Sequence, residues 1–401
     1  MTWSIILLYL LSFLLIWQFV GYPSLMAVVA LKSKPKNKNY SYQPFVSIIV
    51  PAYNEGKAIK KRIKNLFELD YPKDNYEVIV VDSGSTDSTA EIVEDKIKEH
   101  EKNKPNLRLI KEEERKGKAS AINFGKRYAK GDIILVTDAN SIFDKKVLKE
   151  MMPNFEKTEV GAVCGRYVVP NPDNALTSSE SFYSDLEYIL RMGESALDSA
   201  CLFHGEINAW RKDITEADTN CLSEDLDMAI KIRRKGYKIE YEPDAIVYEP
   251  SSTTLEDQIK QKKRRAIGTI QCIFKHLDYF LLPRDLYTLL IFPSHKILTM
   301  LSPFILLAIP LLYVITKNIR VILTHFVLTI FVFVLIFSLL MSLKSKLIRK
   351  NEREKIIFFI PSILKIAYYV LLNEYLIMLA WGEFIFKRYS VLWEKAESTR
   401  E

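Results

Sequence analysis

The sequence is poor in cysteine and contains no repeated unit. Among its 401 residues there are four cysteines, and no two of them form a CxxC pair. Zinc sites and disulfide frameworks need closely spaced or numerous cysteines, so neither is predicted. Internal repeats and low-complexity tracts are also lacking. The cysteines are Cys164, Cys201, Cys221 and Cys272.

Two long stretches lack charge almost completely. Residues 4–20 carry none, and residues 319–343 carry only Arg320. A bilayer core about 30 Å thick needs about 20 apolar residues of helix, so both stretches qualify as membrane spans. Further spans are predicted near residues 297–316 and 356–386. Because Pro361, Asn373 and Glu374 interrupt the last, it is either one tilted helix or a re-entrant pair.

The first apolar run has no basic segment before it and is too long for the core of a typical signal peptide. We therefore expect residues 1–31 to be a retained anchor. The positive-inside rule places the basic residues that follow in the cytoplasm and the N-terminus outside. Residues 344–355, again densely basic, predict a second cytoplasmic loop. The first basic group is Lys32, Lys34, Lys36 and Lys38.

We accordingly expect an integral membrane protein, in the plasma membrane, whose middle region faces the cytoplasm. Its net charge of +7 lies partly in loops that flank membrane spans. Anionic lipid headgroups explain such a charge better than nucleic acid does. Membrane lipids are therefore predicted partners, and nucleic acid is not.

Residues 46–138 alternate between two periodicities. Apolar runs that read as buried strands alternate with segments whose apolar residues recur at helical spacing. This alternation predicts βαβ units, and hence an α/β fold with a mostly parallel sheet and helices on both faces. The predicted strands are 46–53, 76–82, 107–110 and 132–138, and the predicted helices are 59–67, 86–96 and 118–130. A strand at 160–169 and helices near 176–192 and 223–236 follow.

Acidic and polar residues stand where several of these strands end. Tyr53 and Glu55 follow the first strand, Asp82 ends the second, and Asp138 and Asn140 lie at the end of the fourth. In parallel sheets, ligands bind beyond the carboxyl ends of the strands. A buried sheet has no structural use for several carboxylates in one place. These side chains are therefore expected to converge on one ligand-binding crevice.

Six motifs occur in register along the chain: VSIIVPAYNE, VVDSGSTDST, GKASAIN, TDAN, SED and QKKRR. Together they resemble the family-2 inverting glycosyltransferases, which have the GT-A fold. The resemblance covers roughly residues 44–265 and is closer to the membrane-bound branch. That branch includes cellulose, hyaluronan and poly-N-acetylglucosamine synthases and the ceramide glucosyltransferases. The resemblance implies a Rossmann-like GT-A sheet flanked by transmembrane helices, a nucleotide-sugar donor, and Mg²⁺ or Mn²⁺.

Asp138 and Asn140 occupy the position of the family's DxD motif, which holds the metal ion against the donor diphosphate. Asn140 departs from that motif, because an amide oxygen can ligate a hard cation but supplies less negative charge. The alternative is a turn at the strand end that uses Asp and Asn.

The resemblance also assigns donor contacts to Tyr53, Glu55, Asp82 and Lys118. A carboxylate can accept hydrogen bonds from uracil N3–H or from ribose hydroxyls. The alternatives are an Asx-turn at Asp82, a favourable position in the first turn of a helix for Glu55, and a solvated surface lysine at Lys118.

Asp225 matches the last residue of the family's TED motif and is the predicted catalytic base. Inverting transfer is a direct displacement, so one carboxylate on the acceptor hydroxyl suffices. The alternative is that the acids here only complement the N-terminus of a helix. The family's acceptor-binding wall would lie near His204. The residues assigned to the acceptor are Gly205, Trp210 and Glu224, although a lone tryptophan is as often a core residue.

Gln261, Arg264 and Arg265 resemble the family's QxxRW motif, which contacts the donor diphosphate or the acceptor region. Arg265 replaces the tryptophan that ordinarily stacks on the acceptor sugar, and arginine is a poorer stacking platform. Metal-assisted transfer is still expected, whereas processive polymerisation is put in doubt. The same basic run also predicts an interfacial helix that binds anionic lipid.

The predicted organisation has four parts. They are an anchor (1–31), a cytoplasmic GT-A catalytic domain (32–253), a basic interfacial segment (254–285), and a membrane region of about three spans (286–401). The expected activity is metal-dependent, inverting transfer of a sugar from a UDP-sugar to a lipid or a growing polysaccharide. Two alternatives stay open: a transferase that adds one sugar to a lipid, and a degenerate protein that binds sugar nucleotides without turnover.

Overall fold

The computed structural model describes residues 2–100, 105–170, 175–203, 205–250, 252, 254–350 and 363–390. They divide into two compact units, which we name the sheet unit and the helical unit. The sheet unit comprises Pro35–Ser184, Leu202–Gln261 and the described residues from Arg388 onward. The helical unit comprises the chain up to Lys34, Asp185–Cys201 and Lys262–Lys387.

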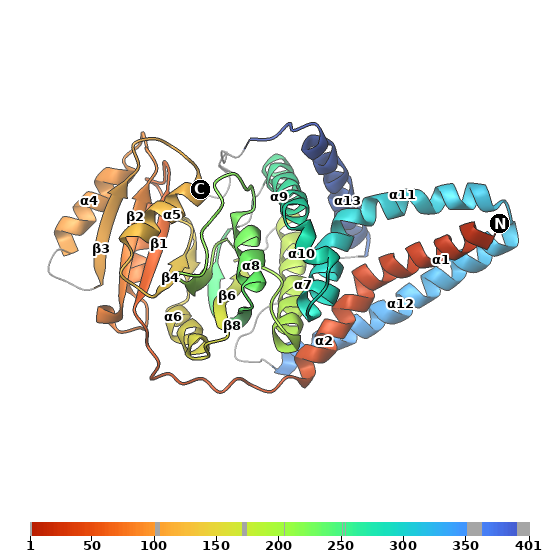
Figure 1. Ribbon diagram of the computed structural model, residues 1–401, viewed down its shortest axis with the longest axis horizontal. Helices are drawn as coiled ribbons and strands as arrows, with labels where there is room; N and C mark the ends of the chain where they lie inside the picture. Colours follow the sequence, from red (N-terminus) through yellow and green to blue (C-terminus); the bar gives the residue numbers. More distant parts are fainter. Residues whose placement is uncertain are drawn as a thin grey trace. The chain divides into compact units, whose positions relative to one another are not determined.

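An eight-stranded sheet in the order β3-β2-β1-β4-β7-β6-β8-β5 forms the centre of the sheet unit (Figure 1). The first four strands pair in parallel, β7 is antiparallel to both of its neighbours, and β8 is parallel to β6 but antiparallel to β5. The predicted α/β fold with a mostly parallel sheet is confirmed. The strands are β1 (Val46–Ala52), β2 (Tyr76–Asp82), β3 (Asn106–Lys111), β4 (Ile133–Val136), β5 (Ile142–Phe143), β6 (Val160–Val168), β7 (Asn208–Arg211) and β8 (Lys238–Tyr248).

Helices pack on both faces of the parallel strands because side chains alternate between the faces of a strand. Ile48 and Val50 of β1 share a core with α3 and α4. Ile49 points the other way, toward α5, where a Cβ on Gly125 would lie 2.9 Å from its Cγ2 atom. Only glycine allows so close an approach of helix and strand. The helices of this unit include α3 (Ile59–Phe67), α4 (Thr89–His100), α5 (Lys118–Tyr128), α6 (Val147–Met151) and α8 (Glu224–Arg234).

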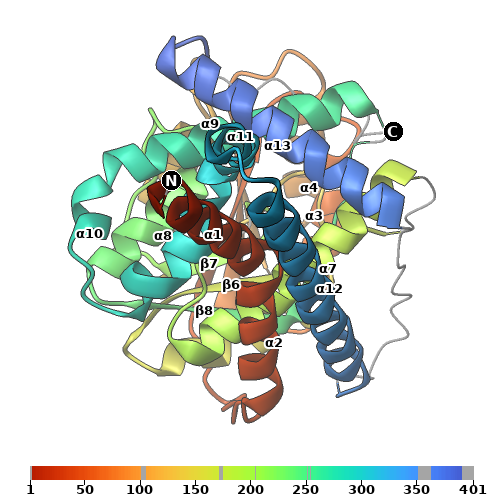
Figure 2. The ribbon, with the colours of Figure 1, turned by 90° about the vertical axis from the view of Figure 1, so that its right-hand side faces the viewer.

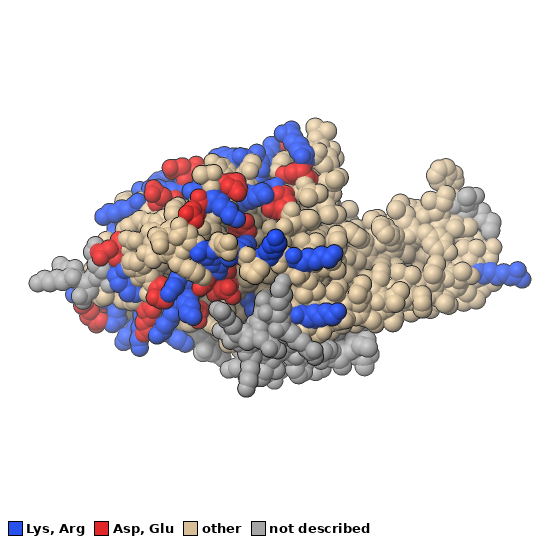
Figure 3. Space-filling view, turned by 90° about the horizontal axis from the view of Figure 1, so that it is seen from below, with Lys and Arg blue, Asp and Glu red and all other residues tan. Residues whose placement is uncertain are grey.

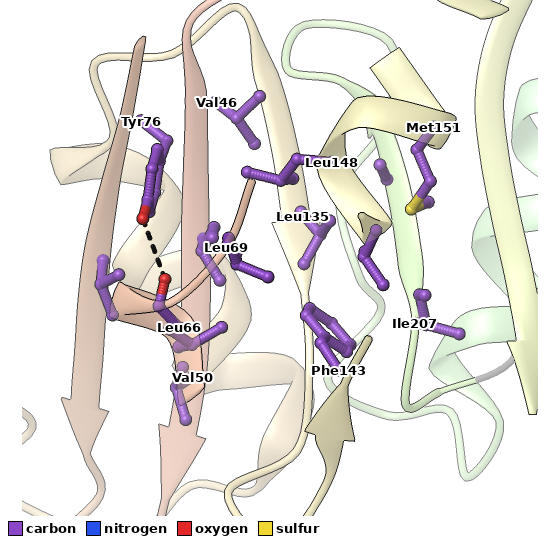
Figure 4. Packing of buried hydrophobic residues seen from close by; sticks show 14 of the residues in the cluster. Val46, Val50, Leu66, Leu69, Tyr76, Leu135, Phe143, Leu148, Met151 and Ile207 are labelled. Carbon is purple, nitrogen blue, oxygen red and sulfur yellow. Dashed lines mark hydrogen bonds between the residues drawn. The ribbon is translucent and has the colours of Figure 1, made fainter. Parts of the chain in front are cut away.

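The main hydrophobic core lies between β1, β2 and β4 on one side and α3 and α6 on the other (Figure 4). Val46 and Leu135 come from neighbouring strands, and Leu66 and Leu148 from the helices that cover them. The Tyr76 hydroxyl, buried with them, donates to the carbonyl of Leu66 at 2.9 Å. Each large apolar side chain buried here contributes about 1.5–3 kcal/mol. This core fixes the ends of β2 and β4, where Asp82 and Asp138 lie.

The helical unit contains three helices long and apolar enough to cross a membrane: Trp3–Lys32, Tyr287–Thr316 and Ile319–Leu347. The first comprises α1 (Thr2–Ile16) and α2 (Tyr22–Lys32), and the others contain α11 (Leu298–Thr316) and α12 (Ile319–Lys350). Helix α1 packs against α11 and α12 (Figure 2). The face of these helices seen in Figure 3 carries almost no charged residue. Three of the predicted spans are thus apolar helices.

Four further helices contribute described residues to this unit, among them α10 (Leu277–Leu281). Helix α13 (Ile363–Ile385) corresponds to the predicted fourth span, whose first part, 356–362, lies outside the described residues. Helices α7 (Ala175–Leu197) and α9 (Leu255–Lys275) each begin among residues of the sheet unit and end among those of the helical unit. The compact units are therefore discontinuous in sequence.

A buried group of charges, which we name the α7 ion cluster, joins α7 to two spans. The ring nitrogens of His295 lie 2.7 Å from a Glu194 oxygen and 3.1 Å from a Glu187 oxygen. The Tyr22 hydroxyl donates to Glu194 at 2.7 Å, and Arg191 forms an ion pair with Glu187 at 3.1 Å. All five side chains are buried, and buried charges are retained only where they are paired in this way.

Lysines that follow the anchor are bound to the sheet unit. Lys36 forms an ion pair with Glu240 at 2.6 Å. Lys38 lies 2.5 Å from Glu150, 2.9 Å from Glu242 and 3.6 Å from Asp244. We name Lys38 and these three acids the lysine clamp. Burial alone would lower the pKa of Lys38, but Glu242 and Glu150 outweigh it and raise the pKa. Lys36 and Lys38, which the sequence places just after the anchor, neutralise acids of β8 and α6.

Candidate active site

The centre of the candidate site is the carboxyl end of β4. Asp138 lies two residues beyond the strand and is half-buried. The preceding Thr137 is fixed at both ends: its N–H donates to the Ile49 carbonyl at 3.2 Å, and its hydroxyl accepts from Arg62 at 2.5 Å. Arg62 is fully buried, and burial lowers its pKa to about 9 even though Asp138 opposes the shift. The carboxylate of Asp138 therefore stands on a rigid, positively charged support.

Three carboxylates meet at this point, and we name them the acid trio. One oxygen from each of Asp138, Glu206 and Glu249 lies within 4.8 Å of the others. Glu206 precedes β7, and Glu249 directly follows β8. Burial, with Glu206 and Asp138 nearby, raises the pKa of Glu249 to about 8. Carboxylates at this spacing are the oxygen ligands that Mg²⁺ and Mn²⁺ prefer, so the residues fit such an ion.

A lysine from α5 already partly neutralises these acids. The Nζ atom of Lys118 lies 2.5 Å from Asp138 and 4.0 Å from Glu224, and it donates to the Gly205 carbonyl at 3.4 Å. Burial alone would lower the pKa of Lys118, but Asp138 and Glu224 outweigh it and raise the pKa. Lys118 is thus part of the site, not a solvated surface lysine.

Asp225 lies beside Lys118 at the start of α8. A Cβ on Gly205 would lie 3.3 Å from the Lys118 Nζ atom and 4.0 Å from an Asp225 oxygen. Asp225 is half-buried, and its other oxygen accepts from the N–H of Leu226 at 2.8 Å. The structure therefore brings Asp138, Lys118, Gly205, Glu224 and Asp225 together, although 87 residues separate Asp138 from Asp225 in sequence.

Asp82 has an unsatisfied buried atom. It ends β2 and is 4% exposed, and its Oδ1 atom has no hydrogen-bond partner among the described residues. A buried carboxylate oxygen without a donor is costly, and such atoms are often explained by a ligand. Asp82 is therefore suited to receive an N–H or O–H donor from a bound molecule.

The loop that contains Tyr53 and Glu55 is fixed to the turn after β2. Asn54 has a φ of 54°, a left-handed conformation that asparagine tolerates. Its side-chain oxygen accepts from the Thr86 N–H at 2.7 Å, and the Glu55 N–H donates to the Thr89 hydroxyl at 2.7 Å. The Arg115 guanidinium lies 4.0 Å from the centre of the Tyr53 ring. These contacts hold Tyr53 and Glu55 in place.

Trp210, predicted to contact the acceptor, is a core residue of the sheet. It is 1% exposed in the middle of the sheet, where it pairs with Ile134 on β4 and Ala162 on β6. A side chain buried to this extent offers no face to a sugar. The structure therefore favours the alternative of a core residue, and we do not retain Trp210 as an acceptor contact. His204 lies outside the described residues.

The QxxRR residues lie on α9. Gln261 belongs to the sheet unit, whereas Arg264 and Arg265 belong to the helical unit. Arg265 is exposed, and Gln261 and Arg264 are half-buried. Their predicted contacts with the donor stay predictions.

The sequence-based reasoning missed two members of the acid trio. Glu249 directly follows β8. The rule that ligands bind beyond the carboxyl ends of strands would have pointed to Glu249 if β8 had been predicted. Glu206 lies in a loop before β7, where no local pattern marks it.

Asn140, predicted as a metal ligand, makes a hydrogen bond to one member of the acid trio. Its side-chain amide N–H donates to Glu249 at 3.2 Å.

Comparisons with known proteins agree with this geometry. The glycosyl transferase family 2 profile matches residues 47–214, and the glycosyl transferase family group 2 profile matches residues 133–380, more than half of the chain. Poly-beta-1,6-N-acetyl-D-glucosamine synthase of Staphylococcus aureus (strain COL) is 28% identical over 241 residues. The enzyme of the same name from Staphylococcus epidermidis is 26% identical over 250 residues. Each match covers 59% of this chain, and the chain spans 56% and 59% of the two relatives' lengths.

Among solved structures, mannosyltransferase PcManGT from Pyrobaculum calidifontis, in complex with GDP-Man and Mn²⁺, superposes with a TM-score of 0.69. The match covers 96% of this chain and all of that one at 24% sequence identity. At this identity the likeness establishes a shared fold.

Proposed function

The chain belongs to glycosyl transferase family group 2, and from this premise we propose that it is a membrane-bound, inverting enzyme. It transfers a sugar from a UDP-sugar to a lipid or a growing polysaccharide. The observation that carries the proposal is the grouping of Asp138, Glu206 and Glu249 with Lys118 and Asp225 beyond the carboxyl ends of the strands. Such an edge is where α/β sheets bind their ligands.

The nucleotide is received by Asp82, Tyr53 and Glu55. The unsatisfied Oδ1 atom of Asp82 supports this role, since it needs a donor such as uracil N3–H or a ribose hydroxyl. Tyr53 supplies an aromatic face at the rim of the same region. Guanine also has N–H donors, and the similar archaeal mannosyltransferase was solved with GDP-Man. The donor test below therefore includes both nucleotides.

Cationic side chains and a divalent ion share the charge of the leaving diphosphate in this proposal. Asp138 with its neighbouring acids would hold Mg²⁺ or Mn²⁺, which would supply positive charge against the negative charge that develops on the leaving group. Lys118 adds a positive charge at the same place. Gln261, Arg264 and Arg265 contribute further donors to the diphosphate or the acceptor region.

Asp225 acts as the general base. The acceptor hydroxyl oxygen forms a bond to the anomeric carbon while the bond from that carbon to the diphosphate oxygen breaks. The diphosphate leaves with the electron pair, and the hydroxyl proton passes to Asp225. A single displacement of this kind inverts the configuration. Gly205 beside Asp225 leaves room for the acceptor, because no side chain fills that position.

The three apolar helices anchor the enzyme in a membrane, for which we propose the plasma membrane. The catalytic residues then face the cytoplasm, where nucleotide sugars are made, and the N-terminus lies outside. Lys32 and Lys34, which precede the lysine clamp in the sequence, remain suited to the cytoplasmic surface.

A donor screen tests the proposal. The full-length protein in native membranes is supplied with UDP- and GDP-sugars, Mn²⁺ and membrane lipids, and products are identified by mass. We expect one UDP-sugar to be consumed, with product length separating single addition from polymerisation. Asp225→Asn is compared with Asp95→Asn, which alters an exposed carboxylate on α4. Equal nucleotide release by Asp225→Asn and wild type would refute the assigned base, and binding without turnover of any donor would refute the activity.

A further inference from the structure

We propose that Glu249 is a ligand of the catalytic cation that replaces the charge lost at Asn140, and that Asn140 is the residue that positions it. This inference rests on the proposed function. It assigns two residues to roles that neither the motif nor the family resemblance gives them.

The motif around Asp138 is one negative charge short. Where a DxD motif would supply two carboxylates, this chain has Asp138 and an asparagine. A divalent cation bound by one carboxylate and one amide is held less tightly, because affinity rises with the number of charged ligands. In the structure a carboxylate lies close to that asparagine, on Glu249.

The contacts of Glu249 indicate an orienting arrangement. The Asn140 amide donates to one of its oxygens at 3.2 Å, and the Ser141 hydroxyl donates to the other at 2.6 Å. Each carboxylate oxygen of Glu249 has two lone pairs, and each accepts one of these hydrogen bonds. One lone pair on each oxygen is left for a cation, while the two hydrogen bonds fix the orientation of the carboxylate. Neutral donors align a carboxylate for a metal ion without cancelling its charge.

The backbone places Glu249 at this position reproducibly. β5 and β8 pair in antiparallel fashion, with Ile142 opposite Tyr248 and Phe143 opposite Val247. Continuing that register by one residue sets Ser141 opposite Glu249. The segment that carries Asp138 and Asn140 leads directly into β5. The pairing of β5 with β8 therefore aligns this segment with Glu249, which follows β8. Loop flexibility is therefore not needed to bring Glu249 to Asp138.

A cationic group already lies at the trio. The Lys118 ammonium is 2.5 Å from Asp138, so this cluster of acids binds positive charge in the structure itself. Fully buried Arg62 interacts electrostatically with Asp138 and Glu249 and lowers the repulsion between them. A purely structural ion network of acids, Lys118 and Arg62 is the competing explanation. It predicts no role for Glu249 in binding a divalent ion.

Mn²⁺ binding separates the two explanations. Binding of Mn²⁺ to the full-length protein in detergent is measured by electron paramagnetic resonance, alone and with UDP or GDP present. We expect Glu249→Gln to raise the dissociation constant for Mn²⁺ by about 10- to 100-fold, the range seen when metal sites lose a supporting residue. The matched control is Glu216→Gln, a glutamate with a 73% exposed side chain that pairs with Lys126.

A charge exchange tests the link to Asn140. In Asn140→Asp/Glu249→Gln the carboxylate and the amide change places, and we expect Mn²⁺ affinity to return to within about threefold of wild type. Asn140→Ala keeps Glu249 but removes its amide partner, and should weaken Mn²⁺ binding by about tenfold. A thermal unfolding midpoint equal to wild type shows in each variant that the fold is intact.

Wild-type Mn²⁺ affinity in Glu249→Gln would overturn the inference, as would the lack of any Mn²⁺ binding by wild type with or without nucleotide. Failure of the double variant to recover affinity would overturn the link to Asn140. Mn²⁺ binding is measured without turnover, so failure of this inference can be told apart from failure of the proposed function. If Mn²⁺ binding follows the expected pattern while no donor is turned over, the activity is wrong and the cation site stands.

Discussion

The described residues of the sheet unit include two groups of three carboxylates that are alike in spacing and different in what neutralises them. In the acid trio and in the lysine clamp, the oxygens lie within 4.8 Å of one another. Lys38 reaches all three acids of the clamp, at 2.5, 2.9 and 3.6 Å. Among the described contacts of the trio, Lys118 forms an ion pair with Asp138, while Glu249 is held by neutral donors. Spacing of acids alone therefore does not identify a cation site.

Exposure separates the two lysines further. The side chain of Lys38 is 11% exposed, and that of Glu242 beneath it 1%. The side chain of Lys118 is 27% exposed and that of Asp138 28%. By side-chain exposure, Lys38 is thus more enclosed than Lys118. We therefore expect the clamp to stabilise the structure and the trio to take part in chemistry.

The largest expected effect on stability is in the clamp. Lys38→Met leaves three carboxylates without their cation, and breaking a buried ion pair costs about 3–5 kcal/mol. Native-state hydrogen exchange at the amides of β8 would measure this loss. Transfer activity per folded molecule should stay the same. If Lys38→Met left exchange unchanged but reduced activity, the contrast between clamp and trio would be wrong.

Asp138→Asn should have the opposite profile. Loss of the main acid at the cation site is expected to slow sugar transfer about a hundredfold, close to 3 kcal/mol in the transition state. The stability should change little, because loss of the ion pair with Lys118 is offset by relief of the repulsion between Asp138 and Glu249. Rates from a coupled assay of nucleotide release and a thermal melt test the two halves of this prediction. A destabilised but active variant would assign Asp138 a structural role.

Mn²⁺ should stabilise the protein through the trio. An ion that binds the folded state at one hundred times its dissociation constant adds about 2.7 kcal/mol. The thermal midpoint should therefore rise with Mn²⁺ and fall back with EDTA in wild type. The response should vanish in Asp138→Asn and persist in Glu150→Gln, a clamp variant. An Mn²⁺ response that was instead lost in Glu150→Gln would place the ion in the clamp.

The smallest effect is expected at an exposed pair. Lys98 and Asp95 lie 3.2 Å apart on α4 with side chains 76% and 68% exposed. Removing either charge should change stability by at most about 0.5 kcal/mol, since water screens such pairs. Urea denaturation would give the free energies of unfolding of Lys98→Met and Lys38→Met, and their difference would measure how much burial strengthens an ion pair. Similar losses in both would argue that burial does not set the strength of the clamp.

The sequence predicted those parts of the fold that local patterns encode. The strands around Ile49 and Val80 are short apolar runs closed by turns, and the acids at their ends follow a general rule of parallel sheets. Asp82 and Asp138 could therefore be placed in the site from the sequence alone. The prediction of Asp225 depended on its match to a family motif.

Long-range pairing accounts for what was missed. β8 contains several charged residues and Pro243, so its sequence shows no clear strand pattern, yet it pairs with strands on both sides. Glu249 could not be found without that pairing. The ion pairs of Lys38 could not be predicted either, because its partners lie more than 100 residues away in the sequence. Trp210 gave no signal of burial, since the strand that contains it is four residues long.

The passage of α7 from one unit to the other has a practical consequence for expressing the catalytic part alone. A fragment cut at the predicted boundaries, residues 32–253, would include Asp185–Cys201 but lack every helix that this segment packs against within the helical unit. Glu187 and Glu194 would lose His295, and Gly193 would lose Met26, whose backbone would lie only 2.4 Å from a Cβ added there. Leu190, which packs with Tyr22 and Met26, would face water. We expect such a fragment to aggregate, and solubility to require either the full chain in detergent or a redesigned α7 surface.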